Sequence, residues 1–172
     1  MPPQDRYVAL ARAAITTYLG KGQRISVPSH TPPELIHQRK GAFVSLKRGT
    51  ELRGCIGTYL PTQTNLAEEI IENAILAATQ DPRFPPVKLE ELPHLRITVD
   101  VLSTPEPCQE MDLDPKRYGV IVESGWRRGL LLPDLPGVDT PQEQLRIAKV
   151  KAGLLPHEPC RLLRFTVERH QG

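Results

Sequence analysis

The sequence lacks the features of a membrane-spanning or secreted protein. None of its apolar runs approaches the roughly 18 residues that cross a bilayer, and its start, Met-Pro-Pro-Gln-Asp-Arg, has no apolar core of the kind found in signal peptides. It contains only three cysteines, Cys55, Cys108 and Cys160, whose wide spacing fits neither a disulfide framework nor a Cys-x-x-Cys metal knuckle. We therefore predict a cytoplasmic protein with free thiols and no membrane contact.

The common nucleotide-binding and hydrolase motifs are also missing. The sequence has no Gly-x-x-x-x-Gly-Lys-Ser/Thr loop, no Gly-x-Gly-x-x-Gly after a strand and no Gly-x-Ser-x-Gly elbow. No two of the five histidines are three or four residues apart, as two metal ligands on one helix face would be, and the three-cysteine run of radical-enzyme iron–sulfur sites is absent. The sequence thus predicts no metal site and no cofactor held by this chain.

Aromatic residues are scarce, at 5%, and the net charge is only +2. The charge is uneven: residues 21–53 hold seven Lys or Arg against two acids, and residues 62–114 hold three against eleven. A nucleic-acid-binding protein usually has a basic total charge, with aromatic residues among the basic ones. Here the aromatic residues lie mostly outside the basic stretch, so nucleic-acid binding through residues 21–53 is a disfavoured alternative.

The composition that is present is that of a folded chain. Leu, Ile, Val and Phe make up about 27% of the 172 residues, above the roughly 20% below which chains tend to stay disordered. The 18 prolines are about twice the usual ~5%, and we interpret them as punctuation between folded segments. We expect one domain spanning residues 1–172, as a monomer or a weak homodimer.

Hydrophobic periodicity predicts helices and hairpins in an order without regular β-helix-β alternation. The first helix is expected over residues 5–19 and ends at Gly20. A second runs from a capping Asn65 to Asp81, and a third from a capping Thr140 to Gly153. A short helical turn is expected at 34–38. Strands are expected over 41–47, 51–60, 95–102, 118–123, 128–132 and 161–168, including two hairpins. This order predicts an α+β domain with a mainly antiparallel β-sheet.

Two glycines interrupt a predicted strand in the segment Leu52-Arg53-Gly54-Cys55-Ile56-Gly57-Thr58. Glycine weakens a strand interior, so the pair indicates a bulge or the close approach of another backbone or a ligand. If Leu52 and Ile56 face the core, alternation places Arg53, Cys55 and Gly57 on the opposite face. An arginine beside a thiol favours the reactive thiolate. Cys55 is therefore a candidate nucleophile, against the alternative of a small thiol packed beneath a helix.

A second unusual segment is Asp81-Pro82-Arg83-Phe84-Pro85-Pro86. Asp81 lies at a predicted helix C-terminus, where the helix dipole disfavours an acid, so we expect Arg83 or Arg53 to pair with it. The three prolines would hold Phe84 in a fixed direction. The alternative is a helix-stopping turn with an aromatic plug.

We predict that these two segments meet in one cleft. In a catalytic site, Cys55 would be the nucleophile, Arg53 would hold an anionic group, and Asp81 would orient Arg53. The residues expected to bind a ligand are Arg53, Gly54, Gly57, Arg83 and Phe84. In a non-enzymatic adaptor, the same groove would bind a peptide or loop of a partner.

Five segments together resemble the AMMECR-type domain family, in the family's order and over nearly the whole chain. They are Gly41-Ala42-Phe43-Val44, Leu52-Arg53-Gly54-Cys55-Ile56-Gly57-Thr58, Asp81-Pro82-Arg83-Phe84-Pro85-Pro86, Leu130-Leu131-Leu132-Pro133 and Lys151-Ala152-Gly153-Leu154. The resemblance implies an α+β fold with an antiparallel sheet, surrounding helices and a smaller subdomain forming a cleft. It implies no known reaction.

The resemblance also implies partners. Bacterial and archaeal members are associated with a Memo-like protein, which resembles non-haem dioxygenases, and with a radical-SAM enzyme, as component A of the AmmeMemoRadiSam system. The run Pro-Gly-Val-Asp-Thr-Pro-Gln-Glu-Gln-Leu before the last predicted helix follows a form seen in many prokaryotic members. Because this chain has no iron–sulfur motif, any radical chemistry would belong to a partner.

Overall fold

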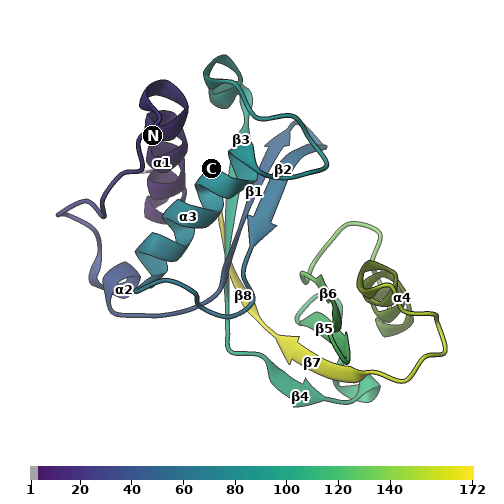
Figure 1. Cartoon of the computed structure of the whole chain (residues 1–172). Helices are drawn as coiled ribbons and strands as arrows, with labels where there is room; N and C mark the ends of the chain where they lie inside the picture. Colours follow the sequence, from purple (N-terminus) through teal and green to yellow (C-terminus); the bar gives the residue numbers. More distant parts are fainter. Residues whose placement is uncertain (1–3) are drawn as a thin grey trace. The chain divides into compact units, whose positions relative to one another are not determined.

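The computed structural model describes residues 4–172 and divides them into two compact units. Unit 1 runs from residue 4 through Leu102 and includes Glu168–Gly172, and unit 2 is Ser103–Val167 (Figure 1). Each unit contains an antiparallel sheet and helices, which confirms the predicted α+β class. Among the described residues, no helix is both long and apolar enough to cross a membrane.

Unit 1 is built on a four-stranded sheet of order β2-β1-β3-β8. Its strands are β1 (Ala42–Arg48), β2 (Glu51–Gly57), β3 (Arg96–Leu102) and β8 (Val167–Gln171). Its helices are α1 (Arg6–Lys21), α2 (Pro33–Ile36), α3 (Leu66–Thr79) and the 3-10 helix η1 (Leu89–His94). The first predicted hairpin is confirmed by the antiparallel pairing of β1 with β2. Strand β2 lies at the edge of the sheet, where its outer backbone groups have no neighbouring strand.

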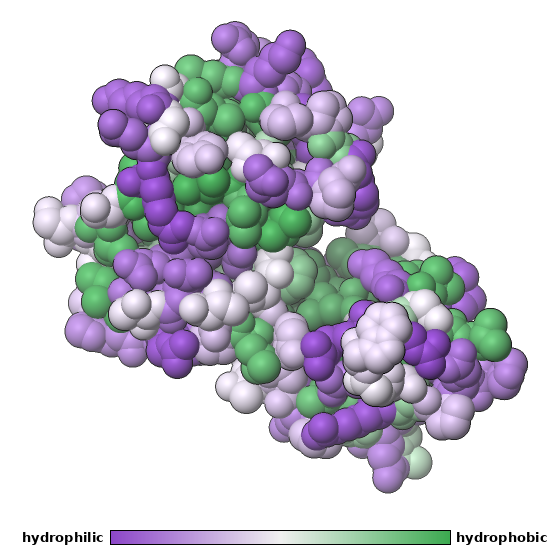
Figure 2. All heavy atoms as spheres, in the orientation of Figure 1, coloured by the Kyte–Doolittle hydropathy of each residue, from purple (hydrophilic) through white to green (hydrophobic). Residues whose placement is uncertain are grey.

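One face of this sheet is apolar and covered by helices, with α3 packed on β1 and β2 and α1 packed on β3. Alternate residues of β1 and β3 form the buried layer: Ala42, Val44, Leu46, Ile97, Val99 and Val101. The residues between them, such as Ser45, Thr98 and Asp100, therefore lie on the other, polar face. Figure 2 shows green hydrophobic residues between hydrophilic ones over α1 and α3.

The helix ends follow local capping chemistry. Asp5 caps α1 by accepting hydrogen bonds from the amides of Tyr7 and Val8, and Asn65 caps α3 by accepting one from the Glu68 amide, as predicted. The predicted end of the first helix at Gly20 is wrong. The helix continues to Lys21 because the left-handed C-cap, at φ +66°, is formed by Gly22, whose amide donates to the Tyr18 carbonyl.

Strand β8 is attached to the rest of unit 1 through side chains as well as backbone. Asp100 and Arg169 form an ion pair with a 2.7 Å contact, and Asp100 is 2% exposed. The His170 ring stacks on Tyr7 with centroids 3.7 Å apart. Its Nδ1 lies 2.7 Å from an Asp5 carboxylate oxygen. These contacts connect β8 to both β3 and the start of α1.

Unit 2 has a sheet of order β4-β7-β5-β6 with one main helix. Its elements are β4 (Glu106–Cys108), η2 (Glu110–Asp112), β5 (Gly119–Ser124), β6 (Arg127–Leu131), α4 (Pro141–Ala152) and β7 (Arg161–Phe165). Helix α4 packs on β5 and β6, and the predicted second hairpin and the Thr140 and Gly153 caps are confirmed. Gly129 allows this packing, because a Cβ atom there would lie 2.1 Å from the Ala148 carbonyl oxygen.

The predicted single strand over residues 161–168 is wrong. It is two strands in different sheets, β7 and β8, separated by Thr166. The Thr166 amide donates to Ser103 Oγ at 2.8 Å, and the Ser103 amide donates to the Thr166 carbonyl at 2.9 Å. The segments that lead into and out of unit 2 are thus joined to each other, and the strand changes sheets at that point.

Candidate functional site

Cys55 lies on the edge strand β2, directly opposite Ser45 of β1. The Cys55 Sγ is 3.2 Å from the Ser45 Oγ, so either group can donate to the other. Ser45 is buried and Cys55 is half-buried, so part of the Cys55 residue is exposed to solvent. The alternative of a small thiol buried beneath a helix is therefore wrong, because Cys55 is half-buried and it is the neighbouring Gly54 that faces α3.

Asp81 is the group that fixes the backbone beside this thiol. Its Oδ2 accepts a hydrogen bond from the Cys55 amide at 3.0 Å. Both oxygens also accept hydrogen bonds from Arg83. Oδ1 accepts from the Arg83 amide and from its Nε, each at 3.0 Å, and Oδ2 accepts from its Nη2 at 2.8 Å. The Arg83 side chain, followed by the amides of Cys55 and Arg83, lowers the pKa of Asp81 to about 2 against the opposing effect of burial. The expected pairing of Asp81 with an arginine is confirmed, and the arginine is Arg83.

This contact explains why an acid is tolerated after α3. The Cys55 amide belongs to an edge strand, and Asp81 gives this amide the acceptor that a neighbouring strand would otherwise supply. The carboxylate is only 5% exposed and has four hydrogen bonds to satisfy its charge. Asp81 therefore joins the end of α3 to the sheet.

Arg53 makes a different set of contacts. Its Nε and Nη2 donate to the two carboxylate oxygens of Glu91, each at 3.1 Å. Its Nη1 donates to the Pro85 carbonyl at 2.7 Å and its Nη2 to the Pro86 carbonyl at 3.2 Å. The Arg53 side chain also lowers the pKa of Glu91. Four of the five guanidinium N–H groups are thus engaged, and Glu91 has the orienting role that the sequence assigned to Asp81.

The two glycines of β2 are explained by close approach, as predicted. A Cβ atom at Gly54 would lie 2.2 Å from the Ala77 carbonyl oxygen of α3, and one at Gly57 would lie 2.2 Å from the Phe43 ring. The β1–β2 register also shifts between Leu46 and Lys47, leaving Arg53 as the extra residue of a β-bulge. The approaching groups are part of this chain, so both glycines serve packing.

The bulge changes which residues of β2 face the core. Ile56 packs against the buried core of unit 1, whereas Leu52 lies opposite Lys47, after the register shift. Placing Leu52 and Ile56 on one face is therefore wrong, because the extra residue interrupts the two-residue alternation.

Arg83 is the more accessible cation beside Cys55. Its side chain is 57% exposed, compared with 17% for Arg53, and its guanidinium carbon lies 5.3 Å from the centre of the Phe84 ring. The pKa of Arg83 is raised mainly by its hydrogen bonds to Asp81, and the charge of a Cys55 thiolate raises it further. An anion approaching the thiol would therefore meet the guanidinium of Arg83.

Sequence reasoning missed Ser45, Glu91 and the Asp100–Arg169 pair. Alternation along β1 and β3 could have placed Ser45 and Asp100 on the polar face with Cys55, once those strands were known to be neighbours. Over residues 4–172, no group of three or more His, Cys, Asp or Glu is arranged to hold a metal ion. The chemistry that this site offers is that of a thiol beside a hydroxyl and a guanidinium.

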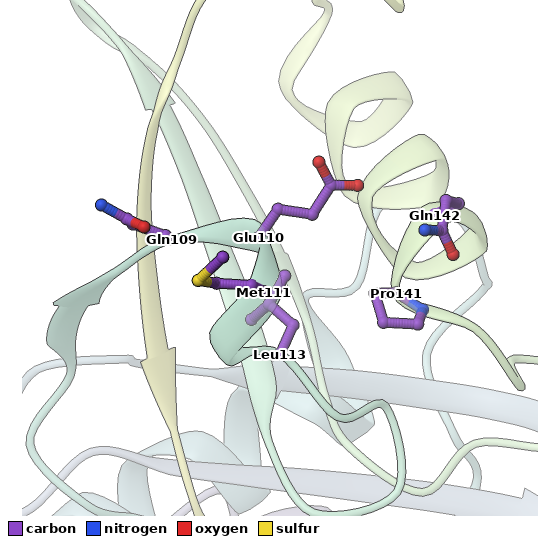
Figure 3. Close-up of a pocket in the computed structure, with 6 residues that line it drawn as sticks. All are labelled: Gln109, Glu110, Met111, Leu113, Pro141 and Gln142. Atoms are coloured by element: carbon purple, nitrogen blue, oxygen red, sulfur yellow. The ribbon is translucent and has the colours of Figure 1, made fainter.

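Unit 2 contains a separate pocket of about 510 Å³, shown in Figure 3. Residues around η2 form one side and the first turn of α4 forms the other; the lining residues are Gln109, Glu110, Met111, Leu113, Pro141 and Gln142. None of the predicted site residues is among them. Glu110 is the only ionisable group in this lining, so the pocket has fewer groups suited to catalysis or ion binding than the surroundings of Cys55.

Comparison with known proteins places the whole chain in one group. The family model AMMECR1 matches residues 8–170. A protein of Thermotoga maritima is 56% identical over 168 residues, covering 96% of this chain and 97% of the relative. The crystal structure of the uncharacterised protein PH0010 of Pyrococcus horikoshii has a TM-score of 0.88 and 42% identity, covering 95% of this chain and 88% of that one.

One relative is much longer. Protein CA_C1420 of Clostridium acetobutylicum is 48% identical over 169 residues, which are 98% of this chain but only 36% of the relative. The remaining 64% of CA_C1420 is chain that lies outside the match.

Proposed function

The chain belongs to the AMMECR1 family, and we propose that it is a binding protein whose site is centred on Cys55. The thiol and the Arg83 guanidinium together form a contact point for an anionic ligand or an anionic segment of a partner. The supporting observation is that one carboxylate, Asp81, holds both the Cys55 amide and the Arg83 side chain. In a catalytic form of this proposal, Cys55 is the nucleophile and Arg83 stabilises negative charge on the substrate.

Alkylation with a matched pair of reagents tests this proposal. Iodoacetate is anionic and iodoacetamide is neutral, and both alkylate a thiolate with loss of iodide. We expect Cys55 to react faster than Cys108, because burial raises the pKa of Cys108. Arg83→Gln should lower the iodoacetate-to-iodoacetamide rate ratio at Cys55 several-fold, whereas Arg6→Gln, at the start of α1, should leave it unchanged.

Mass spectrometry of each cysteine gives the rates, and the unfolding midpoint shows whether each variant remains folded. If Cys55 reacts no faster than Cys108, or if its rate ratio is the same in Arg83→Gln, the site proposal fails. Cys55→Ser provides the baseline without the thiol.

The second part of the proposal concerns partners. We infer that this chain acts together with a Memo-like protein and a radical-SAM enzyme, as the family resemblance implies. In CA_C1420 the matching segment is only 36% of the chain, and covalent linkage would hold a partner module in the remainder at high effective concentration. Copurification of the full chain with each candidate tests this, and loss of binding in Cys55→Ser and Arg83→Gln would place the interface at the proposed site. If neither candidate copurifies, the partner proposal fails, but the alkylation test of the Cys55 site does not depend on that result.

Nucleic-acid binding has less support. Two cations of the basic stretch form ion pairs, Arg24 with Glu72 and Arg53 with Glu91, and Arg39 donates to the Gln63 carbonyl. These contacts reduce the charge available to a phosphate backbone. Salt-sensitive binding of mixed oligonucleotides would favour this alternative over the protein partner.

A further inference from the structure

Unit 1 contains a second pocket, formed by α1 and the segment that leads to α2, both at the purple and dark blue end of Figure 1. Its volume of about 560 Å³ is within the range of small-molecule sites. One wall is a stripe of α1, made by Arg6, Ala9, Leu10 and Ala13, which share one helix face. The opposite wall is formed by Pro28, His30, Thr31, Pro32 and Leu35.

The walls of this pocket are stiff and its interior is unfilled by large side chains. Ala9 and Ala13 leave space that longer residues would occupy, while Leu10, Pro32 and Leu35 form a buried floor. The Thr31 amide and hydroxyl both donate to the Pro28 carbonyl, at 3.1 and 2.6 Å, and the prolines fix their own φ angles. A preorganised wall loses little conformational entropy when a ligand binds.

The charges of the lining favour an anion. Arg6 and His30 are its basic residues and no acid is among the lining side chains. Within residues 4–172, the Arg6 guanidinium has no hydrogen bond or ion pair. Two acids on adjoining elements lie outside the lining: Asp5 contacts His170 and caps α1, and Glu34 is on α2.

We propose that this pocket binds a small aliphatic carboxylate. The guanidinium of Arg6 binds the carboxylate through paired hydrogen bonds, and Ala9, Leu10, Pro32 and Leu35 contact the hydrocarbon chain. An aliphatic carboxylate fits better than a phosphate or nucleotide because the lining is mostly apolar and offers one guanidinium. The site is independent of the Cys55 proposal, since the two share no residue.

Titration of the full chain with octanoate, followed by calorimetry and by amide chemical shifts, tests the proposal. Hexanoate, two methylenes shorter, should bind about fifteenfold more weakly, because each buried methylene changes the affinity about fourfold. Octanol, which lacks the charge, should bind at least tenfold more weakly than octanoate. The shifted amides should be those of residues 6–13 and 28–35.

Two variants and a control complete the test. Arg6→Gln should weaken octanoate binding at least tenfold, and Ala9→Leu should fill the pocket and abolish binding. Arg48→Gln, at the exposed end of β1, should leave octanoate binding unchanged. Thermal unfolding shows that each variant is folded. The proposal is overturned if octanoate does not bind, if it binds Arg6→Gln as tightly as the parent, or if the shifted amides lie elsewhere.

Discussion

Replacing Asp81 with Asn should remove a pH-dependent part of the protein's stability. The folded-state pKa of Asp81 is about 2, compared with an ordinary 3.8. Since each pKa unit corresponds to ~1.36 kcal/mol, ionised Asp81 stabilises the folded state by about 2.4 kcal/mol at neutral pH. This stabilisation is complete above pH 3.8, because the folded pKa is the lower one, and it is lost as the pH falls from 3.8 towards 2.

Asp81→Asn keeps an oxygen that can accept from the Cys55 amide but loses the charged bonds to Arg83. We therefore expect the variant to be about 2 kcal/mol less stable than the parent at pH 7. The difference should shrink as the pH is lowered below 4. Urea unfolding of both proteins at pH 7, 5, 4 and 3 measures it.

The matched control is Asp139→Asn. The Asp139 side chain is 74% exposed and pairs with Lys116 at the surface, so its replacement should change stability little at any pH. A stability difference for Asp81→Asn that stays constant from pH 7 to pH 3 would refute the assignment of the effect to ionisation. No difference at pH 7 would refute the role of Asp81 as the connection between α3 and β2.

Three other substitutions have expected results in the same unfolding assay. Gly54→Ala should destabilise the protein by more than the ~1 kcal/mol span of strand propensities, because the added Cβ atom would lie 2.2 Å from the Ala77 carbonyl oxygen. Gly20→Ala, inside α1, should instead stabilise the protein by about 0.5–1 kcal/mol, because its Cβ atom would lie 3.7 Å from Leu89, an ordinary contact distance. Equal effects of the two substitutions would contradict this explanation. Asn65→Ala should cost about 1 kcal/mol through loss of the α3 cap, so an unchanged midpoint would remove that cap from the account. Gln144→Met should cost about 1–3 kcal/mol, because it leaves the Tyr118 carbonyl without this donor, although it also removes a buried oxygen that has no partner among residues 4–172; an unchanged midpoint would refute the role of this bond.

Sequence reasoning succeeded where the physical signal is local. Caps such as Asn65 and Thr140 act on amides three residues away, and hairpins join neighbouring segments, so both are visible in short windows. It also identified Asp81 as an acid in need of a partner, which the neighbouring Arg83 supplies. These features need no knowledge of the tertiary fold.

The contacts that define the candidate site are not local. The Asp81 contact with the Cys55 amide spans 26 residues, and the Arg53 contact with Glu91 spans 38. Strand β4 is also hard to predict from local sequence, because its Pro107 lacks an amide hydrogen and normally indicates that a strand has ended. Here Pro107 is tolerated because β4 lies at the edge of its sheet. Predicting such features requires knowing which strands are edges.

The insertion of unit 2 between β3 and β8 has a consequence for synthesis of the chain. Ribosomes build proteins from the N-terminus at about 5–20 residues per second, and contiguous domains fold as they emerge. Unit 2 is contiguous over Ser103–Val167, whereas β8 is translated after it and must return to pair with β3. Until then β3 is an open edge, and the Asp5–His170 and Asp100–Arg169 contacts cannot form. The nascent chain therefore cannot complete unit 1 until the strands of unit 2 have been synthesised.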